Sequence, residues 1–334
     1  MKFGFGFVPR MSIADSVSVV QRGEALGFDM AWIPDQTFYR DPFLVMSAWA
    51  AATRDIQFMI GVTNPFTRHP VQVARAMATL DEMTGGRANL GIGAGNRREL
   101  LLPMGYEQDH SATRCRDMGQ IVRELLQGEE VHYRSDFFVA DGVRLEWEAP
   151  RPDLPIYIAG RGSWTLSAAG EIADGAIVGA LVSPAGLDYA FDAIASGVEK
   201  AGRSPDDVKL ISWVTCQVVD DWNEIEGRLK RSAAHIIGGA PRNLLTSIGL
   251  EEHYVDALKA TYASGGQEEA ARHVTEREID MLSIVGDAGK VTAKIQQLAE
   301  RGVDQVGVLL TEPDADSCIA VIERIAQEII PNFR

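Results

Sequence analysis

The segment 61–65 has the residue types of a site that binds a flat ligand. A glycine is followed there by small polar residues and a proline. Because glycine has no Cβ atom, the backbone at Gly61 can approach a planar ring closely. A turn that simply ends a strand has the same composition and is the alternative. The candidate residues for such a slot are Gly61, Val62, Thr63 and Asn64.

The segment 159–163, Ala-Gly-Arg-Gly-Ser, is a candidate anion-binding loop. It leads from a short apolar run directly into a helical pattern, so free backbone amides and the positive end of a helix would meet there. Arg161 adds a positive charge. A glycine-rich turn with Ser163 as the helix cap is the alternative. The candidate binding residues in this region are Ala159, Gly160, Arg161, Gly162 and Val178.

Other motifs that carry chemistry are weak or missing. Segment 91–96 resembles a dinucleotide-binding fingerprint but lacks the third glycine at the required spacing, which disfavours a Rossmann site. Asn96 stays a candidate cofactor-binding residue. The histidines show no metal-ligand spacing, so we expect no metal site. No motif for a serine nucleophile or for nucleotide hydrolysis is present. These patterns favour a cofactor that performs the difficult chemistry itself.

Short apolar runs alternate with amphipathic helical patterns along the chain. The predicted strands are residues 3–8, 30–33, 56–62, 88–92, 156–159, 176–179, 208–219 and 305–310. The predicted helices between and after them are 12–27, 43–52, 71–83, 112–126, 164–173, 187–201, 291–301 and 317–329. This alternation favours an α/β fold, a (β/α)8 TIM barrel with its site at the C-terminal strand ends, over a doubly wound open sheet. We expect a single domain over residues 1–334.

Two segments interrupt the alternation. Residues 131–147 show strand-type alternation around Asp141-Gly142, which predicts a hairpin there. Residues about 226–283, after the seventh strand, look helical and are not needed to close a barrel. Insertions in barrels usually build a lid or one wall of the substrate pocket. An ornamental or dimer-forming insertion is the alternative.

Composition limits the partners of the chain. The net charge of −15 is spread along the sequence, which argues against nucleic acids and anionic membranes, because phosphate contacts need clustered Lys and Arg. No stretch approaches 18 consecutive apolar residues, so we expect no membrane span. Cys115, Cys216 and Cys318 lie far apart with no Cys-x-x-Cys pair, which fits a reducing cytoplasm. A small molecule is the expected substrate.

Taken together, these motifs resemble those of the luciferase-like superfamily, and within it the branch that uses the deazaflavin coenzyme F420. The methylenetetrahydromethanopterin reductases are the closest likeness. The resemblance spans nearly the whole chain. The segments that carry it are 27–29 with Trp32 and Asp35, 61–65 with 68–70, 84–87 with 90–95, 155–158 with 173–175, 274–286 and 328–331.

The resemblance implies roles for individual residues. In relatives, a non-proline cis peptide on the third strand backs the deazaflavin ring, and it would fall between Gly61 and Val62 here. An Asp at the tip of the second strand lies beside the ring and corresponds to Asp35. Many relatives follow that Asp with His, whereas this chain has Gln36. The phosphate loop corresponds to 159–163, and a homodimer is implied.

One departure from the resemblance concerns the substrate. The pterin reductases carry a Glu in the first strand that serves the reaction, and the matching residue here is Gly6. Glycine can neither donate nor relay a proton. We therefore do not expect the pterin reaction, and Gly6 would instead open room for a different substrate. The candidate general acids are His69 and Glu99, and the candidate catalytic residues are Asp35, Gln36 and His69.

The favoured hypothesis is an F420-dependent oxidoreductase that moves a hydride between C5 of the cofactor and an organic carbonyl, alcohol or activated double bond. An FMN-dependent monooxygenase on the same barrel is the alternative, and a non-catalytic flavin-binding protein is a second one. The deazaflavin carries an anionic oligoglutamyl tail and so needs a basic exit path. Its candidates are Arg97, Arg98 and Arg161. If these arginines are tied up in structural ion pairs, the FMN hypothesis gains.

Overall fold

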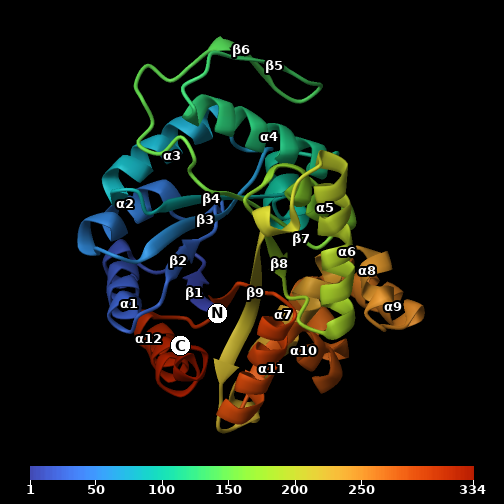
Figure 1. The fold of residues 1–334 in the computed structure, drawn as a ribbon. Coiled ribbons are helices and arrows are strands. Elements are labelled where there is room, and N and C mark those ends of the chain that lie inside the picture. The colour runs from blue at the N-terminus through green and yellow to red at the C-terminus, as the bar shows by residue number, and fades with distance from the viewer.

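Parallel strands close into a barrel in the computed structural model, which describes residues 1–334 (Figure 1). The barrel strands are β1 (Lys2–Phe7), β2 (Met30–Ile33), β3 (Gln57–Thr63), β4 (Ala88–Gly93), β7 (Ile156–Gly160), β8 (Gly175–Gly179), β9 (Lys209–Val218) and β11 (Gln305–Leu310). Each pairs in parallel with the next, and β11 pairs with both β9 and β1, which completes the ring. The predicted (β/α)8 barrel is confirmed.

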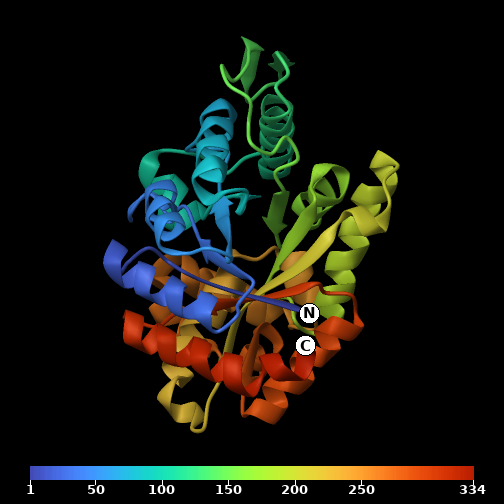
Figure 2. The ribbon, with the colours of Figure 1, turned by 60° about the vertical axis from the view of Figure 1, so that its left-hand side comes forward.

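Helices cover the outside of the barrel, as Figures 1 and 2 show. They are α1 (Ile13–Ala25), α2 (Pro42–Ala52), α3 (Pro70–Thr84), α4 (Ser111–Leu126), α5 (Ser163–Ile172), α6 (Pro184–Ala201), α11 (Ala288–Glu300) and α12 (Ala315–Glu328). Their starts follow local capping chemistry. The Ser12 hydroxyl accepts the Asp15 amide at 3.1 Å, and prolines occupy the first turn of α2, α3 and α6. No helix is both long and apolar enough to cross a membrane.

The strand residues alternate between two cores. On β1, the side chains of Phe3, Phe5 and Phe7 join the outer core between strands and helices. The intervening Gly4 and Gly6 face the barrel axis, because successive strand residues point to opposite faces. The axis itself is filled by a separate apolar cluster of Met30, Trp32, Met59, Ile177 and Ile211. The barrel is therefore packed along its axis, and only its ends can hold a ligand.

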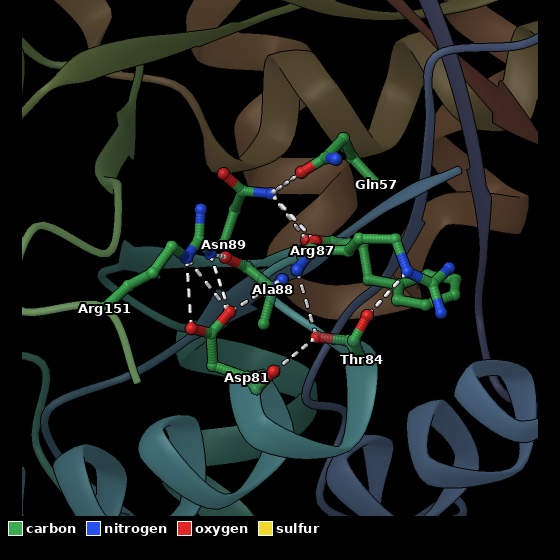
Figure 3. A network of polar contacts seen from close by, with 8 residues as sticks. Gln57, Asp81, Thr84, Arg87, Ala88, Asn89 and Arg151 are labelled. Atoms are coloured by element: carbon green, nitrogen blue, oxygen red, sulfur yellow. Dashed lines mark hydrogen bonds and ion pairs between the residues drawn. The ribbon is translucent and has the colours of Figure 1, made fainter. Parts of the chain in front are cut away.

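The N-terminal end of the barrel is held by the buried polar network in Figure 3. The carboxylate of Asp81 pairs with the guanidinium of Arg151 at 2.7 Å. Arg87 donates from Nε to the carbonyl of Thr84 at 2.7 Å, and Asn89 donates to the carbonyl of Arg87 at 3.3 Å. These contacts join the end of α3 to the start of β4. This end of a TIM barrel serves stability, so the functional site is sought at the other.

The hairpin forms, but its turn is not where the sequence indicated. Strands β5 (Val131–Arg134) and β6 (Val139–Val143) are antiparallel, and residues 135–138 form the turn. Asp141 lies inside β6, where its carboxylate contacts His132 Nδ1 at 2.9 Å. Gly142 has a φ of 65° and is the extra residue at a register shift. The Asp-Gly signal therefore marks a bulge, which also favours glycine at positive φ.

Residues after β9 form four helices that pack on one another, drawn in yellow-orange to orange in Figure 1. These are α7 (Glu226–Gly239), α8 (Arg242–Ser247), α9 (Glu252–Ala270) and α10 (Glu276–Leu282). A short strand, β10 (Ser283–Gly286), follows and pairs with the second half of β9. The sequence analysis missed β10. The long β9 thus pairs with β8 on one edge and, on the other edge, with β11 along its first half and β10 along its second.

Candidate active site at the C-terminal end of the barrel

The tip of β3 has the irregular backbone that the resemblance implied. The peptide bond between Gly61 and Val62 is cis. The pairing of β3 with β4 shifts register at this point, between Ile60 and Thr63. The side chain of Val62 is partly exposed, while Gly61 is buried. The strand tip therefore presents an apolar surface without a bulky side chain at the barrel mouth.

The glycines of β4 have a packing role beside this tip. A Cβ atom on Gly91 would lie 2.6 Å from the Ile60 carbonyl oxygen and 3.0 Å from Val62 Cγ1. A Cβ atom on Gly93 would lie 2.6 Å from Val62 Cγ2. Any larger residue at either position would collide with β3. This explains the glycine pattern of segment 91–96 without a dinucleotide.

Asp35 is fixed by a set of contacts at the same tip. Its carboxylate accepts the Thr63 hydroxyl at 2.8 Å and pairs with Arg68 at 2.5 Å from Nε and 3.1 Å from Nη2. Its amide donates to the Val62 carbonyl at 3.2 Å. Its side chain is 3% exposed. The geometry suits a residue that positions the β3 tip, because both oxygens of its carboxylate are held by these contacts.

Arg68 links Asp35 to a second carboxylate, that of Asp41, at 2.7 Å. Burial alone would lower the pKa of the Arg68 guanidinium, but hydrogen bonds to Asp35 and Asp41 outweigh it and raise this pKa. The sequence analysis quoted Arg68 only within a motif and did not identify it as the partner of Asp35. The available signal was the position of Arg68. It follows the end of one predicted strand by a few residues, and Asp35 follows the end of the neighbouring predicted strand.

Of the remaining predicted residues near β2 and β3, some make hydrogen bonds to loop or helix backbone, and one has no side-chain partner. Asn64 accepts the amides of Phe66 and Thr67 through its side-chain oxygen. His69 is exposed, caps α3 through Nδ1 at 3.3 Å from the Val71 amide, and packs against a hairpin residue. These are structural contacts, and none of them joins His69 to Asp35. The side chain of Gln36 is partly exposed and makes no hydrogen bond within the chain.

A second cluster lies where the loop after β4 meets the helices that follow β9. Asn96 caps the π-helical turn η1 (Arg97–Leu101) by accepting the Glu99 amide at 3.0 Å. The carboxylate of Glu99 lies 3.4 Å from His235 Nδ1 on α7, and the Tyr262 hydroxyl on α9 lies 3.0 Å from that nitrogen. Helices of the expected insertion therefore reach the loop after β4.

The protonation of this second cluster argues against Glu99 as an acid. A hydrogen bond from His235 lowers the pKa of Glu99 although partial burial opposes it. Burial, together with the neighbouring carboxylate, raises the pKa of Tyr262 to about 12. Glu99 is thus ionised and Tyr262 protonated near neutral pH. Neither group is poised to exchange a proton there.

The loop after β7 has unsatisfied capacity for an anion. Gly162, not Ser163, is the N-cap of α5, and the Ser163 amide donates to the Tyr189 hydroxyl at 3.1 Å. Arg161 has no carboxylate partner and donates only to the Ile236 carbonyl, at 3.1 Å. Burial lowers the pKa of its guanidinium. Val178 points its side chain into the outer core, so only its backbone can face this loop.

The other two arginines of the expected exit path differ from each other. Arg97 is exposed and lies 3.6 Å from Glu107, a loose surface pair. The guanidinium of Arg98 lies 5.3 Å from the ring centre of Tyr262, and its buried Nη1 has no hydrogen-bond partner. Arg98 and Arg161 are therefore not tied up by carboxylates. Because buried donors usually find an acceptor, both favour an anionic ligand nearby.

The space above Gly6 is filled rather than open. A Cβ atom there would lie 2.8 Å from Cη2 of Trp213 and 2.8 Å from the Trp32 carbonyl oxygen. The expectation that Gly6 enlarges the pocket was wrong, because the indole of Trp213 crosses the barrel and occupies that volume. The sequence analysis missed Trp213. Its only signal was a large aromatic residue at an inward position of a predicted strand.

Comparisons with known proteins agree with this geometry. A family model described as luciferase-like monooxygenase matches residues 2–305. The 5,10-methylenetetrahydromethanopterin reductase of Archaeoglobus fulgidus is 32% identical over 338 residues, with 100% of both chains covered. The F420-dependent glucose-6-phosphate dehydrogenase of Nakamurella multipartita is 33% identical over 202 residues, which cover 56% of this chain and 59% of that one. The structure of the coenzyme F420 dependent tetrahydromethanopterin reductase from Methanopyrus kandleri superposes with a TM-score of 0.87 at 29% identity, covering 100% of this chain and 99% of that one.

Proposed function

Since the chain belongs to the luciferase-like monooxygenase family, we propose that it is an oxidoreductase that uses coenzyme F420. The dehydrogenase of Nakamurella multipartita and the reductase from Methanopyrus kandleri are both F420-dependent by name. The reaction is hydride transfer between the cofactor and a small organic carbonyl, alcohol or activated double bond. The FMN and non-catalytic alternatives have no comparable support.

The observation that carries the cofactor assignment is the pair of arginines without carboxylate partners. Arg98, in the turn after β4, lies over the Tyr262 ring of α9, and Arg161, in the loop after β7, donates to the Ile236 carbonyl of α7. An anionic cofactor that reached this region would give the orphan Nη1 of Arg98 an acceptor. At the start of α5 beside Arg161, the Ser163 amide already donates to the Tyr189 hydroxyl, so the cation of this loop carries the argument. These residues fit the phosphate and the acidic tail of F420.

The residues at the β3 tip fit the flat part of the cofactor. Val62 presents a partly exposed surface on which a planar ring would rest, with Thr63 and Asp35 behind it and the buried Gly61 packed against Trp213. When bound, F420 supplies the hydride acceptor or donor. Asp35 fixes the position of the β3 tip, because its amide donates a hydrogen bond to the Val62 carbonyl. The side chain of Gln36 is partly exposed and has no partner within the chain. It is therefore available to contact the ring or the substrate.

The proposed protein is a single-domain homodimer with a helical wall at its pocket. Residues 1–334 act as one barrel domain, and α7–α10 form a wall of the pocket, which the contact of His235 with Glu99 supports. The buried, unpaired cysteines agree with a reducing cytoplasm. A homodimer is proposed from the family resemblance and is tested by light scattering of the purified protein.

A parallel titration tests the cofactor. Purified protein is mixed separately with F420 and with FMN, and cofactor fluorescence is followed. We expect saturable binding of F420 at micromolar or lower concentration and none of FMN. Binding of FMN alone would overturn the proposal. Reduced F420 is then supplied with a panel of ketones and enones, and its reoxidation under nitrogen establishes the reaction class.

A further inference from the structure

Two tryptophans are stacked along the barrel axis. The rings of Trp32 on β2 and Trp213 on β9 have centroids 4.3 Å apart and planes 46° apart. Trp32 is fully buried, whereas Trp213 is partly exposed. The exposed part of Trp213 therefore faces away from Trp32. That direction is toward the C-terminal mouth of the barrel, where the candidate site lies.

Two glycines make room for the Trp213 indole. Cη2 lies 2.8 Å from where a Cβ atom of Gly6 would be, and Cζ3 lies 3.2 Å from the corresponding point on Gly61. A side chain at position 6 and the indole of Trp213 would compete for one volume. The ring thus spans the mouth from β9 to β1 and abuts the same glycine that begins the irregular tip of β3.

The mouth has an apolar patch on one side and two cations on another. Leu309 on β11 is the register partner of Gly6 and is partly exposed. Together with Trp213 it gives the side formed by β9, β11 and β1 an apolar surface. The cationic groups Arg98 and Arg161 lie instead on the loops after β4 and β7, beneath α7 and α9. A ligand with an anionic end and an apolar reacting partner would match this division.

We propose that Trp213 is a specificity-determining residue that gives the substrate an apolar wall. The substrate class is an uncharged ketone, secondary alcohol or enone with hydrocarbon substituents, and not a phosphorylated sugar. Burial against an indole favours hydrocarbon groups, and Arg228, the cation at the end of β11, is already paired with Glu312 at 2.5 Å. This inference rests on the proposed function, because it assumes that the F420 ring occupies the β3 tip.

The test uses the F420-loaded protein and two probes. Cyclohexanone is the uncharged probe and glucose 6-phosphate the charged one, and their binding is measured by calorimetry. We expect cyclohexanone to bind and glucose 6-phosphate not to bind. Trp213→Ala should weaken cyclohexanone binding about tenfold or more, as expected for the loss of a hydrophobic pocket wall. Trp213→Phe should retain most of it, and F420 affinity is measured for both variants so that a loss of cofactor binding is told apart from a loss of cyclohexanone binding.

Controls separate specificity from folding. Trp147→Ala removes an exposed tryptophan in the segment between β6 and β7 and should leave both affinities unchanged. Thermal unfolding of each variant shows whether it is folded, and Trp213→Phe supplies the comparison if Trp213→Ala is not. Equal cyclohexanone affinity in wild type and Trp213→Ala would overturn the inference, as would preferential binding of glucose 6-phosphate. Failure of the wild-type protein to bind F420 would overturn the proposed function itself, a separate result.

Discussion

The carboxylate of Asp35 and the guanidinium of Arg68 form a two-point ion pair at the base of the β3 tip, with nitrogen–oxygen distances of 2.5 and 3.1 Å. Through the Asp35 amide, the same residue holds the Val62 carbonyl. One buried carboxylate therefore connects β2, the β3 tip and the loop that leads into α3. The surface proposed to support the cofactor ring therefore depends on this ion pair.

Replacing Asp35 with Asn should loosen this tip. The variant keeps an acceptor for Thr63 but leaves a half-buried Arg68 with Asp41 as its only carboxylate. We expect the free energy of unfolding to fall by about 2–4 kcal/mol, since breaking a buried pair leaves a charge uncompensated. F420 affinity should fall as well. Denaturant unfolding and cofactor titration measure the two effects.

The matched control for this prediction is Asp41→Asn. It removes the more exposed partner of Arg68 and leaves the contact between Asp35 and Arg68 in place. Its loss of stability should be the smaller of the two, and its F420 affinity should stay near that of the wild type. Equal losses in the two variants would show that Asp35 has no special part in the tip.

The barrel and the glycine tips could be predicted from the sequence because their signals are local. Apolar runs of four to eight residues mark strands whatever their partners, and Ser12 with Asp15 marks a helix start. The Asp-Gly pair in β6 shows the limit of such signals. Glycine at positive φ serves a bulge as well as a turn, and only the pairing of the strands decides between them.

Long-range partners could not be predicted in this way. Arg68 meets Asp35 only because two strand tips lie side by side, a relation between residues 33 positions apart. Trp213 fills the space over Gly6 across the barrel, which depends on strand register rather than on any neighbouring residue. Neither Gly6 on β1 nor Trp213 on β9 indicates by itself that the two occupy one volume. The role of each residue follows only when the structure places both.

Arg161→Ala should weaken F420 binding without unfolding the protein. Its guanidinium has one carbonyl partner and no ion pair, so little is lost in the free protein. If it meets the phosphate of the cofactor, its removal should cost about 1–3 kcal/mol of binding free energy. Arg97→Ala, which removes an exposed and loosely paired cation, is the control. An unchanged affinity for Arg161→Ala would remove this residue from the site.

Glu99→Gln should change stability in a pH-dependent way. Because His235 and its neighbours lower the pKa of Glu99 in the folded protein, the ionised carboxylate stabilises the fold above its ordinary pKa of 4.5. This stabilisation is lost as the pH falls through the lower, folded value. Nearly half of the side chain is exposed, so the effect should stay below about 1 kcal/mol.

The measurement for Glu99 compares denaturant unfolding of wild type and Glu99→Gln at pH 7 and at pH values below 4.5. The wild type should be more stable at pH 7, and the two proteins should converge as the pH falls. Glu251→Gln is the control, since that exposed carboxylate lies beside an exposed histidine outside the cluster. A difference that is constant with pH would show that the charge of Glu99 is not what matters.

Gly91→Ala separates two explanations for the glycines of β4. If they bind a dinucleotide, alanine should lower ligand affinity and leave stability intact. The structure favours the other explanation, because the added Cβ would lie 2.6 Å from the Ile60 carbonyl, and a backbone atom cannot move aside cheaply. We expect a loss of about 1–3 kcal/mol in the free energy of unfolding of the cofactor-free protein, as for other overpacked sites. Gly227→Ala on α7, where the nearest atom is the end of an arginine side chain at 3.7 Å, should be neutral or slightly stabilising. If Gly91→Ala is as stable as the wild type but binds the cofactor less well, the β4 glycines bind the ligand and are not required for packing against Val62.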